Sequence, residues 1–183
     1  MKIEKTQFPG LVIVKPTIFP DNRGYFFESY NQNEFQKAGI DFISVQDNES
    51  KSCKGVIRGL HYQLRPYTQA KLIRVVDGKI LDVALDLRKS SETYGKWFSI
   101  ELNSEKKEQL LVPEGFAHGF SVLSDIAVIQ YKCNNFYNPQ AERGILITDP
   151  FLNIDWKLGT TSSLISNKDL KHPVFRDAEY NFD

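Results

Sequence analysis

Short hydrophobic runs, separated by Gly, Pro, Asn, Asp or Ser, follow one another along most of this sequence. Runs of this kind are typical of β-strands linked by turns. We expect strands over residues 11–14, 25–30, 43–45, 56–60, 71–76, 79–86, 97–102, 109–112, 118–123, 127–133 and 144–148. Their number and regular spacing predict an all-β fold, either a sandwich or a barrel of jelly-roll type.

Turn residues predict how some of these strands are connected. The turn at residues 21–24, Asp-Asn-Arg-Gly, predicts a pair of strands on either side of it. Asp77-Gly78 predicts a two-residue hairpin between 71–76 and 79–86. In the second of these runs apolar residues alternate with Asp82, Ala84 and Asp86. That alternation predicts a half-buried strand with one polar face.

Helix is expected only near the two ends. Residues 31–39 begin with a capping asparagine, carry Phe35 and Ala38 on one face and end at Gly39. A capped helical turn is predicted over residues 166–170.

Composition restricts the class of protein further. A chain of 183 residues with 41% hydrophobic residues is long enough for one core, so we expect a single domain over 1–183. Equal numbers of basic and acidic residues, 23 each, argue against a nucleic-acid or membrane surface. The first residues show no signal peptide, and Cys53 and Cys133 suit a reducing compartment. We therefore expect a cytoplasmic protein.

Two of the three histidines, His61 and His118, lie on Gly-punctuated segments where a small barrel would gather side chains into one cavity. A barrel metal site would need a third histidine and a carboxylate, but the neighbour of His61 on the same strand face is Gln63. We expect no metal.

Without a metal, the residues suit proton transfer next to a carbonyl, which needs a base, a cation near the developing oxyanion and an acid. His61 is the natural base, Lys71 the natural cation and Tyr131 a natural acid. Each of the three also has a structural interpretation: a hydrogen-bonded histidine, a solvated lysine and a buried tyrosine. Their co-occurrence with Arg58 favours the chemical interpretation.

Phosphate binding is a further possibility, because the forked guanidinium groups of Arg23 and Arg58 match phosphoryl oxygens. Arg23 could instead only decorate its turn. Several aromatic residues are expected in the core, with base stacking as a minority interpretation: Phe19, Phe26, Phe27, Phe136 and Tyr137.

The sequence closely resembles one known family over about residues 8–173. The resemblance rests on segments in a fixed order: 21–29, 45–48, 55–63, 71–75, 113–120 and 131–133. These segments resemble the dTDP-4-dehydrorhamnose 3,5-epimerases, cupin-fold enzymes of deoxysugar biosynthesis. The resemblance implies a cupin-type jelly-roll barrel, no cofactor and inversion of C3 and C5 of dTDP-4-dehydro-6-deoxy-D-glucose to give dTDP-4-dehydro-L-rhamnose.

The same resemblance implies residue roles. His61 would be the base, Asp169 its orienting carboxylate, Tyr131 the acid on the opposite face and Lys71 the cation beside the C4 oxygen. Tyr137 would stack on thymine, with Phe19 and Phe26 as weaker candidates. Other positions would bind the nucleotide sugar: Arg23, Glu28, Gln46, Asn48, Arg58, His118, Glu142 and Lys168.

The family's enzymes are homodimers that exchange N-terminal strands, and the apolar residues 11–14 are compatible with this. Epimerases of C3 alone or C5 alone share much of the constellation, so they stay open as alternatives. A 3,4-ketoisomerase on a related nucleotide sugar and a non-catalytic cupin module that binds a ligand also stay open. No family pattern covers residues 174–183, from which we expect little chemistry.

Overall fold

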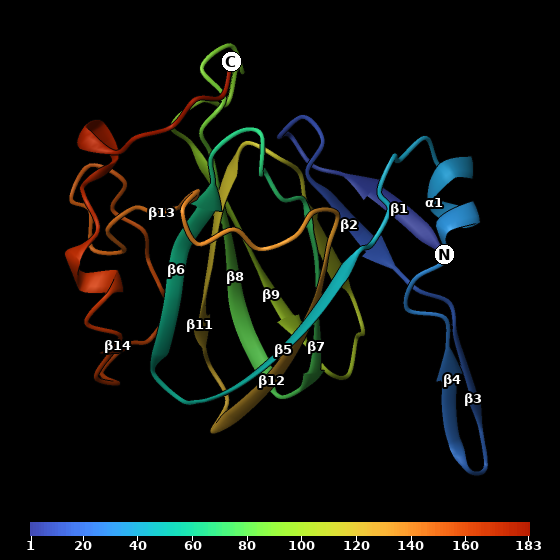
Figure 1. The fold of residues 1–183 in the computed structure, drawn as a ribbon. Helices are drawn as coiled ribbons and strands as arrows, with labels where there is room; N and C mark the ends of the chain where they lie inside the picture. The colour runs from blue at the N-terminus through green and yellow to red at the C-terminus, as the bar shows by residue number, and fades with distance from the viewer.

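A computed structural model describes residues 1–183, and two sheets of six and five main strands form a β-barrel (Figure 1). The strands are β1 (Lys2–Lys5), β2 (Val12–Lys15), β3 (Ile18–Asp21), β4 (Gly24–Phe27), β5 (Gln46–Cys53), β6 (Val56–Gln63), β7 (Lys71–Asp77), β8 (Lys79–Asp86), β9 (Trp97–Asn103), β10 (Gln109–Val112), β11 (Phe116–Val122), β12 (Ile126–Cys133), β13 (Glu142–Gly144) and β14 (Leu164–Ile165). The helical elements are α1 (Gln32–Lys37) and the 3₁₀ turns η1 (Asp169–Lys171) and η2 (Phe175–Asp177).

The first sheet has the order β1-β2-β10-β7-β12-β5, and the second has the order β13-β6-β11-β8-β9. Neighbouring strands are antiparallel except β14, which adds to β6 in parallel. Between the sheets lies a core that includes Leu11, Ile73, Ile80, Phe116 and Ile129. The prediction of an all-β barrel is confirmed, and the architecture is cupin-like.

The strands β3 and β4 form a separate hairpin that projects away from the barrel (Figure 1). This hairpin confirms the strand pair predicted around residues 21–24. Phe19 and Phe26 stack on one another here and are 58% and 69% exposed. Phe136 and Tyr137, on a loop, are also more than half exposed. Placing these aromatic residues in the core was therefore wrong, because their segments leave the barrel.

The helix predicted near the N-terminus is confirmed as α1. Asn31 Oδ1 accepts a hydrogen bond from the Asn33 N–H at 3.0 Å, which caps the first turn. Phe35 is fully buried against Phe42 and Tyr30, and Gly39 follows with φ of +75°. The capped turn predicted at 166–170 is present in part: η1 covers Asp169–Lys171, and its N-cap residue Lys168 makes no capping bond, although Ser166 Oγ accepts from the Asp169 N–H at 3.0 Å.

The hairpin predicted at Asp77-Gly78 is wrong. β7 pairs with β10 and β12, whereas β8 pairs with β11 and β9 in the other sheet. At Gly78 the chain passes from the first sheet to the second, with φ of +79°. A Cβ at this position would clash with the backbone carbonyl oxygen of Ile126. Asp77-Gly78 does mark a bend in the chain, but a local turn signal does not specify which strands pair.

The prediction that β8 has one polar face toward solvent is also wrong. All of its residues after Lys79 are buried, including Asp82 and Asp86 with no exposed surface. One face looks into the barrel, and the other packs under Ile147, Trp156 and neighbouring residues that follow β13. The alternation of apolar residues with Asp82, Ala84 and Asp86 therefore distinguishes two faces of β8 that are both buried.

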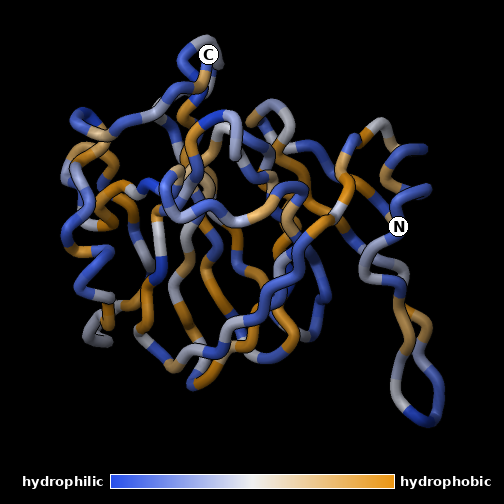
Figure 2. Tube along the Cα trace, viewed as in Figure 1, coloured by the Kyte–Doolittle hydropathy of each residue, from blue (hydrophilic) through white to orange (hydrophobic).

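Strand β5 is missed by the hydrophobic pattern, which predicts a strand at 43–45 instead. Gln46–Cys53 is polar, and its alternate residues are exposed because it forms the edge of the first sheet. Figure 2 shows β5 and the hairpin tip as hydrophilic stretches beside apolar barrel strands. The short strand β1 was also not predicted, and regular pairing in the 144–148 segment stops at Gly144.

Candidate active site

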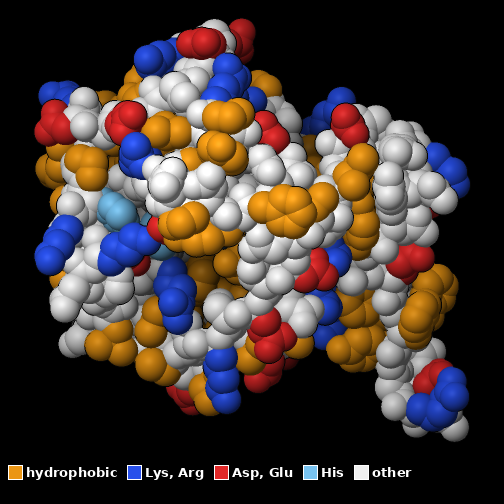
Figure 3. Space-filling view, in the orientation of Figure 1, with side chains coloured by type: hydrophobic (Ala, Val, Ile, Leu, Met, Phe, Trp, Pro, Cys, Tyr) orange, Lys and Arg blue, Asp and Glu red, His pale blue; other side chains and the backbone are white.

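A cavity of about 560 Å³ opens between the sheets, and a second hollow of about 230 Å³ adjoins it. His61, Lys71 and Tyr131 line both spaces. Figure 3 shows a histidine surface in a hollow between Lys and Arg side chains. The barrel therefore gathers the three residues predicted for proton transfer into one place.

His61 and Asp169 form a hydrogen-bonded pair. His61 Nε2 lies 2.8 Å from Asp169 Oδ1, and the carboxylate is almost fully buried at the start of η1. Burial raises the pKa of Asp169, but the hydrogen bond and charge of His61 outweigh it and hold the pKa below its usual value. An ionised carboxylate on Nε2 leaves Nδ1 as the nitrogen available to accept a proton.

Lys71 begins β7 and lies beside Cys133, its partner in the register with β12. Burial lowers the pKa of Lys71, and the charges of Cys133, Glu142 and Asp82 oppose the shift. Burial likewise raises the pKa of the Cys133 thiol, which accepts a long contact from Asn48 Nδ2 at 3.7 Å. Lys71 is partly buried and lines both hollows, and a cation shielded in part from water attracts a developing oxyanion more strongly than one in bulk solvent.

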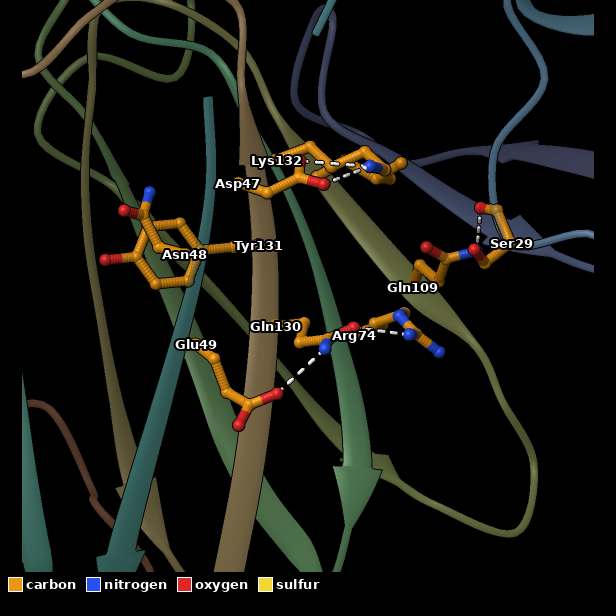
Figure 4. A pocket seen from close by; sticks show the side chains of 10 residues that line it. Ser29, Asp47, Asn48, Glu49, Arg74, Gln109, Gln130, Tyr131 and Lys132 are labelled. Atoms are coloured by element: carbon orange, nitrogen blue, oxygen red, sulfur yellow. Dashed lines mark hydrogen bonds and ion pairs between the residues drawn. The ribbon is translucent and has the colours of Figure 1, made fainter. Parts of the chain in front are cut away.

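Tyr131 reaches the cavity from the wall opposite to His61. It lies on β12 of the first sheet, whereas His61 lies on β6 of the second. In Figure 4 the Tyr131 ring points away from the side on which Gln130 and Lys132 lie. Burial raises the pKa of Tyr131, which keeps its phenol protonated and able to donate.

His118 is paired with a residue that was not predicted for the site. His118 and His61 are direct partners across β11 and β6. His118 Nε2 lies 2.9 Å from Asp82 Oδ1, and both residues are buried. The signal for Asp82 was present in the sequence as a carboxylate within the hydrophobic run of β8, but it was read as part of a solvent face.

A second group of predicted residues surrounds the adjoining hollow. Glu142 on β13 accepts hydrogen bonds from Tyr137 Oη at 2.8 Å and from Lys168 Nζ. These contacts hold the pKa of Glu142 below its usual value despite its partial burial. Gln46 Oε1 accepts from the Tyr137 N–H at 2.9 Å and so fixes the loop that presents this ring.

Gln63, the residue that argued against a metal site at the sequence level, holds a neighbouring loop in place. Its Oε1 accepts from the Asn138 N–H at 2.7 Å, and its Nε2 donates to the Phe136 carbonyl at 3.2 Å. It thereby holds the loop that carries Tyr137.

The two arginines predicted to bind phosphate lie in different places. Arg58 lines the main cavity and donates to Ser52 Oγ at 3.1 Å. Arg23 lies at the hairpin turn, 85% exposed and paired with Asp21. Glu28 immediately follows the hairpin, and neither it nor Arg23 lines the main cavity or the adjoining hollow. Arg23 and Glu28 are the predicted residues that a single chain does not bring to the site.

His172 is the second residue that the sequence did not indicate. Its Nε2 is 3.6 Å from Asp169 Oδ1, and its ring meets the His61 ring edge to face at 5.7 Å. Burial and the neighbouring His61 lower the pKa of His172. Donor atoms of His61, Asp169 and His172 lie within 4.8 Å of one another, so these are the residues that could hold a divalent cation.

The outer face of the first sheet carries a further polar depression of about 320 Å³ (Figure 4). Lys132 Nζ pairs with Asp47 at 2.8 Å, and Gln130 bridges Arg74 and Glu49. Its charged side chains are thus engaged with one another, and Tyr131, which also lines it, points toward the main cavity.

No helix of the structure is long and apolar enough to cross a membrane. The cupin-like barrel, with a His–Asp pair, a partly buried lysine and a facing tyrosine around one cavity, defines a class of isomerase that moves protons next to a carbonyl. A model of one family, described as dTDP-4-dehydrorhamnose 3,5-epimerase, matches residues 5–177. The chain belongs to this family.

Known relatives agree over nearly the whole length. The dTDP-4-dehydrorhamnose 3,5-epimerase of Shigella flexneri is 53% identical over 98% of this chain and 99% of the relative. The crystal structure of the Elizabethkingia anophelis enzyme is 48% identical, covers 97% of each chain and has a TM-score of 0.92. The Legionella pneumophila structure, in complex with dTDP-4-keto-L-rhamnose, is 44% identical over 96% of this chain and 93% of that one, with a TM-score of 0.92.

Proposed function

We propose that this protein converts dTDP-4-dehydro-6-deoxy-D-glucose into dTDP-4-dehydro-L-rhamnose by inverting C3 and C5. The observation that carries the proposal is the placement of a His61–Asp169 pair and Tyr131 on opposite walls of one cavity. Inversion of a stereocentre requires a base on one face of the substrate and an acid on the other. Family membership over residues 5–177 supports the same reaction.

In the proposed mechanism, Nδ1 of His61 removes the proton from C3. The electron pair of the broken C–H bond forms a C3–C4 double bond, and the carbonyl oxygen at C4 becomes an enolate oxygen. The Lys71 ammonium stabilises this charge, and Asp169 stabilises the imidazolium. Tyr131 then donates its phenolic proton to C3 from the opposite face, which restores the ketone with inverted configuration. After both groups exchange protons with solvent, the same steps occur at C5.

The nucleotide would occupy the rest of the cavity. Arg58 is suited to the diphosphate, and Tyr137 to stacking on the thymine ring. Polar residues near them would contact the base, ribose or sugar: Gln46, Asn48, His118, Glu142 and Lys168.

We also propose that the protein works as a homodimer, with 1–183 as a single domain in the cytoplasm. The projecting hairpin supports a dimer, because its Phe19, Phe26 and Arg23 are exposed and line neither hollow of the site in their own chain. In a dimer, Arg23 and Glu28 would complete the site of the second copy.

Incubation of the protein with dTDP-4-keto-6-deoxyglucose in deuterated water tests the function. We expect deuterium at both C3 and C5 by NMR. Label at one carbon only would support a single-carbon epimerase, and a shifted carbonyl would indicate a ketoisomerase. Binding without any label would reduce the protein to a ligand-binding module and overturn the proposal.

The same assay tests for a metal. Because His61, Lys71 and Tyr131 supply base, cation and acid, we expect the rate of label incorporation to survive prolonged dialysis against a strong chelator. The dialysed protein with added zinc is the control. A rate that dialysis abolishes and zinc restores would place a cation at His61, Asp169 and His172 and contradict the mechanism.

A further inference from the structure

Residues 178–183 lie beyond the family match, and we call them the C-terminal strap. The strap is fixed to the barrel by specific contacts. Tyr62 Oη donates to the Glu179 carbonyl at 2.6 Å, and Arg143 Nε pairs with the Glu179 carboxylate at 2.7 Å. The Arg65 N–H donates to Asn181 Oδ1 at 3.0 Å. In Figure 1 the strap crosses the upper end of the barrel, above the end of β6.

The contacts of the strap direct Phe182 inward. The Lys89 N–H donates to the Phe182 carbonyl at 3.2 Å, and the ring is only 2% exposed. It packs against the Tyr62 ring at 6.0 Å between centroids and above the Cα of Gly115. A phenyl ring this deeply buried is an anchor rather than a loose terminal residue.

Behind the Phe182 ring is a void of about 10 Å³ that is also lined by His61, Lys71 and His118. A space of this size holds about one water molecule at most. The Phe182 ring therefore separates these three site residues from the outside at the upper end of the barrel, while the large cavity serves as the entrance for substrate.

We propose that Phe182 is a positioning residue that plugs the upper end of the catalytic cavity and keeps water from reaching Lys71 at its back. The proposal rests on the role of Lys71 given under the proposed function. An ammonium group attracts an enolate more strongly when water is excluded, because less charge is screened.

The exclusion of water from Lys71 can be measured through the pH dependence of the rate. Burial lowers the pKa of Lys71. The charged and titratable groups around it come from three strands, Asp82 on β8, Cys133 on β12 and Glu142 on β13, and from the two histidines that share the void. Activity requires the ammonium form, so the rate falls as the pH rises through the lowered pKa. Admitting water would raise that pKa and move the fall to higher pH.

The test compares Phe182→Ala with Phe182→Leu, which keeps an apolar plug. We expect Phe182→Ala to lower kcat by roughly tenfold with little change in KM, and to shift the alkaline limb of the kcat profile to higher pH. Phe182→Leu should have a kcat and an alkaline limb close to those of the wild type. Phe175→Ala is the matched control, since Phe175 is 6% exposed in the same apolar cluster but does not line the void.

Thermal unfolding of the three variants distinguishes a specific effect of the Phe182 ring on the cavity from a general loss of stability. If Phe182→Ala and Phe175→Ala lose stability and kcat alike without a shift of the alkaline limb, the role of Phe182 is only structural and the inference fails. The inference also fails if Phe182→Ala has the same dependence of kcat on pH as the wild type. Lys71→Met serves as the separate check, because wild-type activity in that variant would contradict the proposed function and not the position of the plug.

Discussion

His61 depends on a carboxylate that lies 108 positions away in the sequence. The sequence alone indicated His61, Lys71 and Tyr131 from the chemistry of their side chains, and resemblance to the family added Asp169. Asp82 and His172 were missed because nothing local marks a residue as the partner of a distant histidine. Side-chain type therefore predicted the groups that we propose to react, whereas Asp82 and His172 became visible as partners of these histidines only in the folded chain.

Two substitutions test the division of roles between the walls of the cavity. We expect His61→Ala to lose about 10³-fold or more in deuterium exchange at both carbons, because the base is removed. Tyr131→Phe should keep exchange on the His61 face but lose the inverted product, since only the donor is removed.

Product stereochemistry and deuterium content by NMR report both effects. Phe136→Leu, at an exposed side chain that lines neither hollow of the site, is the control. An undiminished yield of inverted product from Tyr131→Phe would show that another group donates the proton.

The strands explain how these residues meet. β6 carries Arg58 and His61, and its close approach to β11 depends on Gly59 and Gly119. A Cβ on Gly59 would lie 2.6 Å from the Gly119 Cα, and Gly59 has φ of +137°. The hydrophobic pattern located β6 correctly but gave no indication of this contact. It also missed the polar edge strand β5, because an edge strand needs few buried side chains.

Gly59→Ala and Gly24→Ala form a matched pair. Gly24 has nearly the same φ, +136°, but nothing lies within 4 Å of its missing Cβ. We expect Gly24→Ala to lower the free energy of unfolding by about 1–3 kcal/mol through backbone strain. Gly59→Ala should cost about 1–3 kcal/mol more, because β6 and β11 must also move apart.

Denaturant unfolding of the two variants gives the difference directly. Gly59→Ala should in addition lower kcat, since the displaced strand carries His61. Equal losses of stability in the two variants would mean that the contact with Gly119 relaxes freely.

At the scale of the whole molecule, the hairpin β3–β4 stands outside the barrel with Arg23 at its turn. In a single chain this hairpin projects away from the barrel that holds the other predicted residues (Figure 1). Resemblance to the family predicted both that Arg23 binds the substrate and that the protein is a homodimer. The two predictions are linked, because an arginine on a projecting hairpin would reach a site in a second copy. The dimer is the arrangement in which a projecting arm has a site to reach.

Mixing two inactive variants tests this arrangement. In a dimer of an Arg23→Ala chain with a His61→Ala chain, one site receives His61 from the first chain and Arg23 from the second. After subunits exchange at random, about a quarter of the wild-type activity should return, because half of the dimers then have one intact site of two. Native mass spectrometry of the mixture, with one variant carrying a short mass tag, is the control for exchange, because mixed dimers then have a mass of their own. If the mixture of variants regains nothing while exchange is demonstrated, Arg23 acts within its own chain or not at all.

The sequence by itself determined the all-β class, most strand positions, the capped helix α1 and the chemical identity of the side chains that we propose to react. These features follow from local causes: side-chain periodicity, turn residues, capping groups and functional groups. Only the tertiary structure decided that β7 and β8 belong to different sheets, that β8 is buried on both faces, that Asp82 and His172 stand behind the histidines, and that Phe182 closes the barrel. Each of these depends on contacts between segments distant in sequence, and burial is a property of what covers a residue rather than of the residue itself.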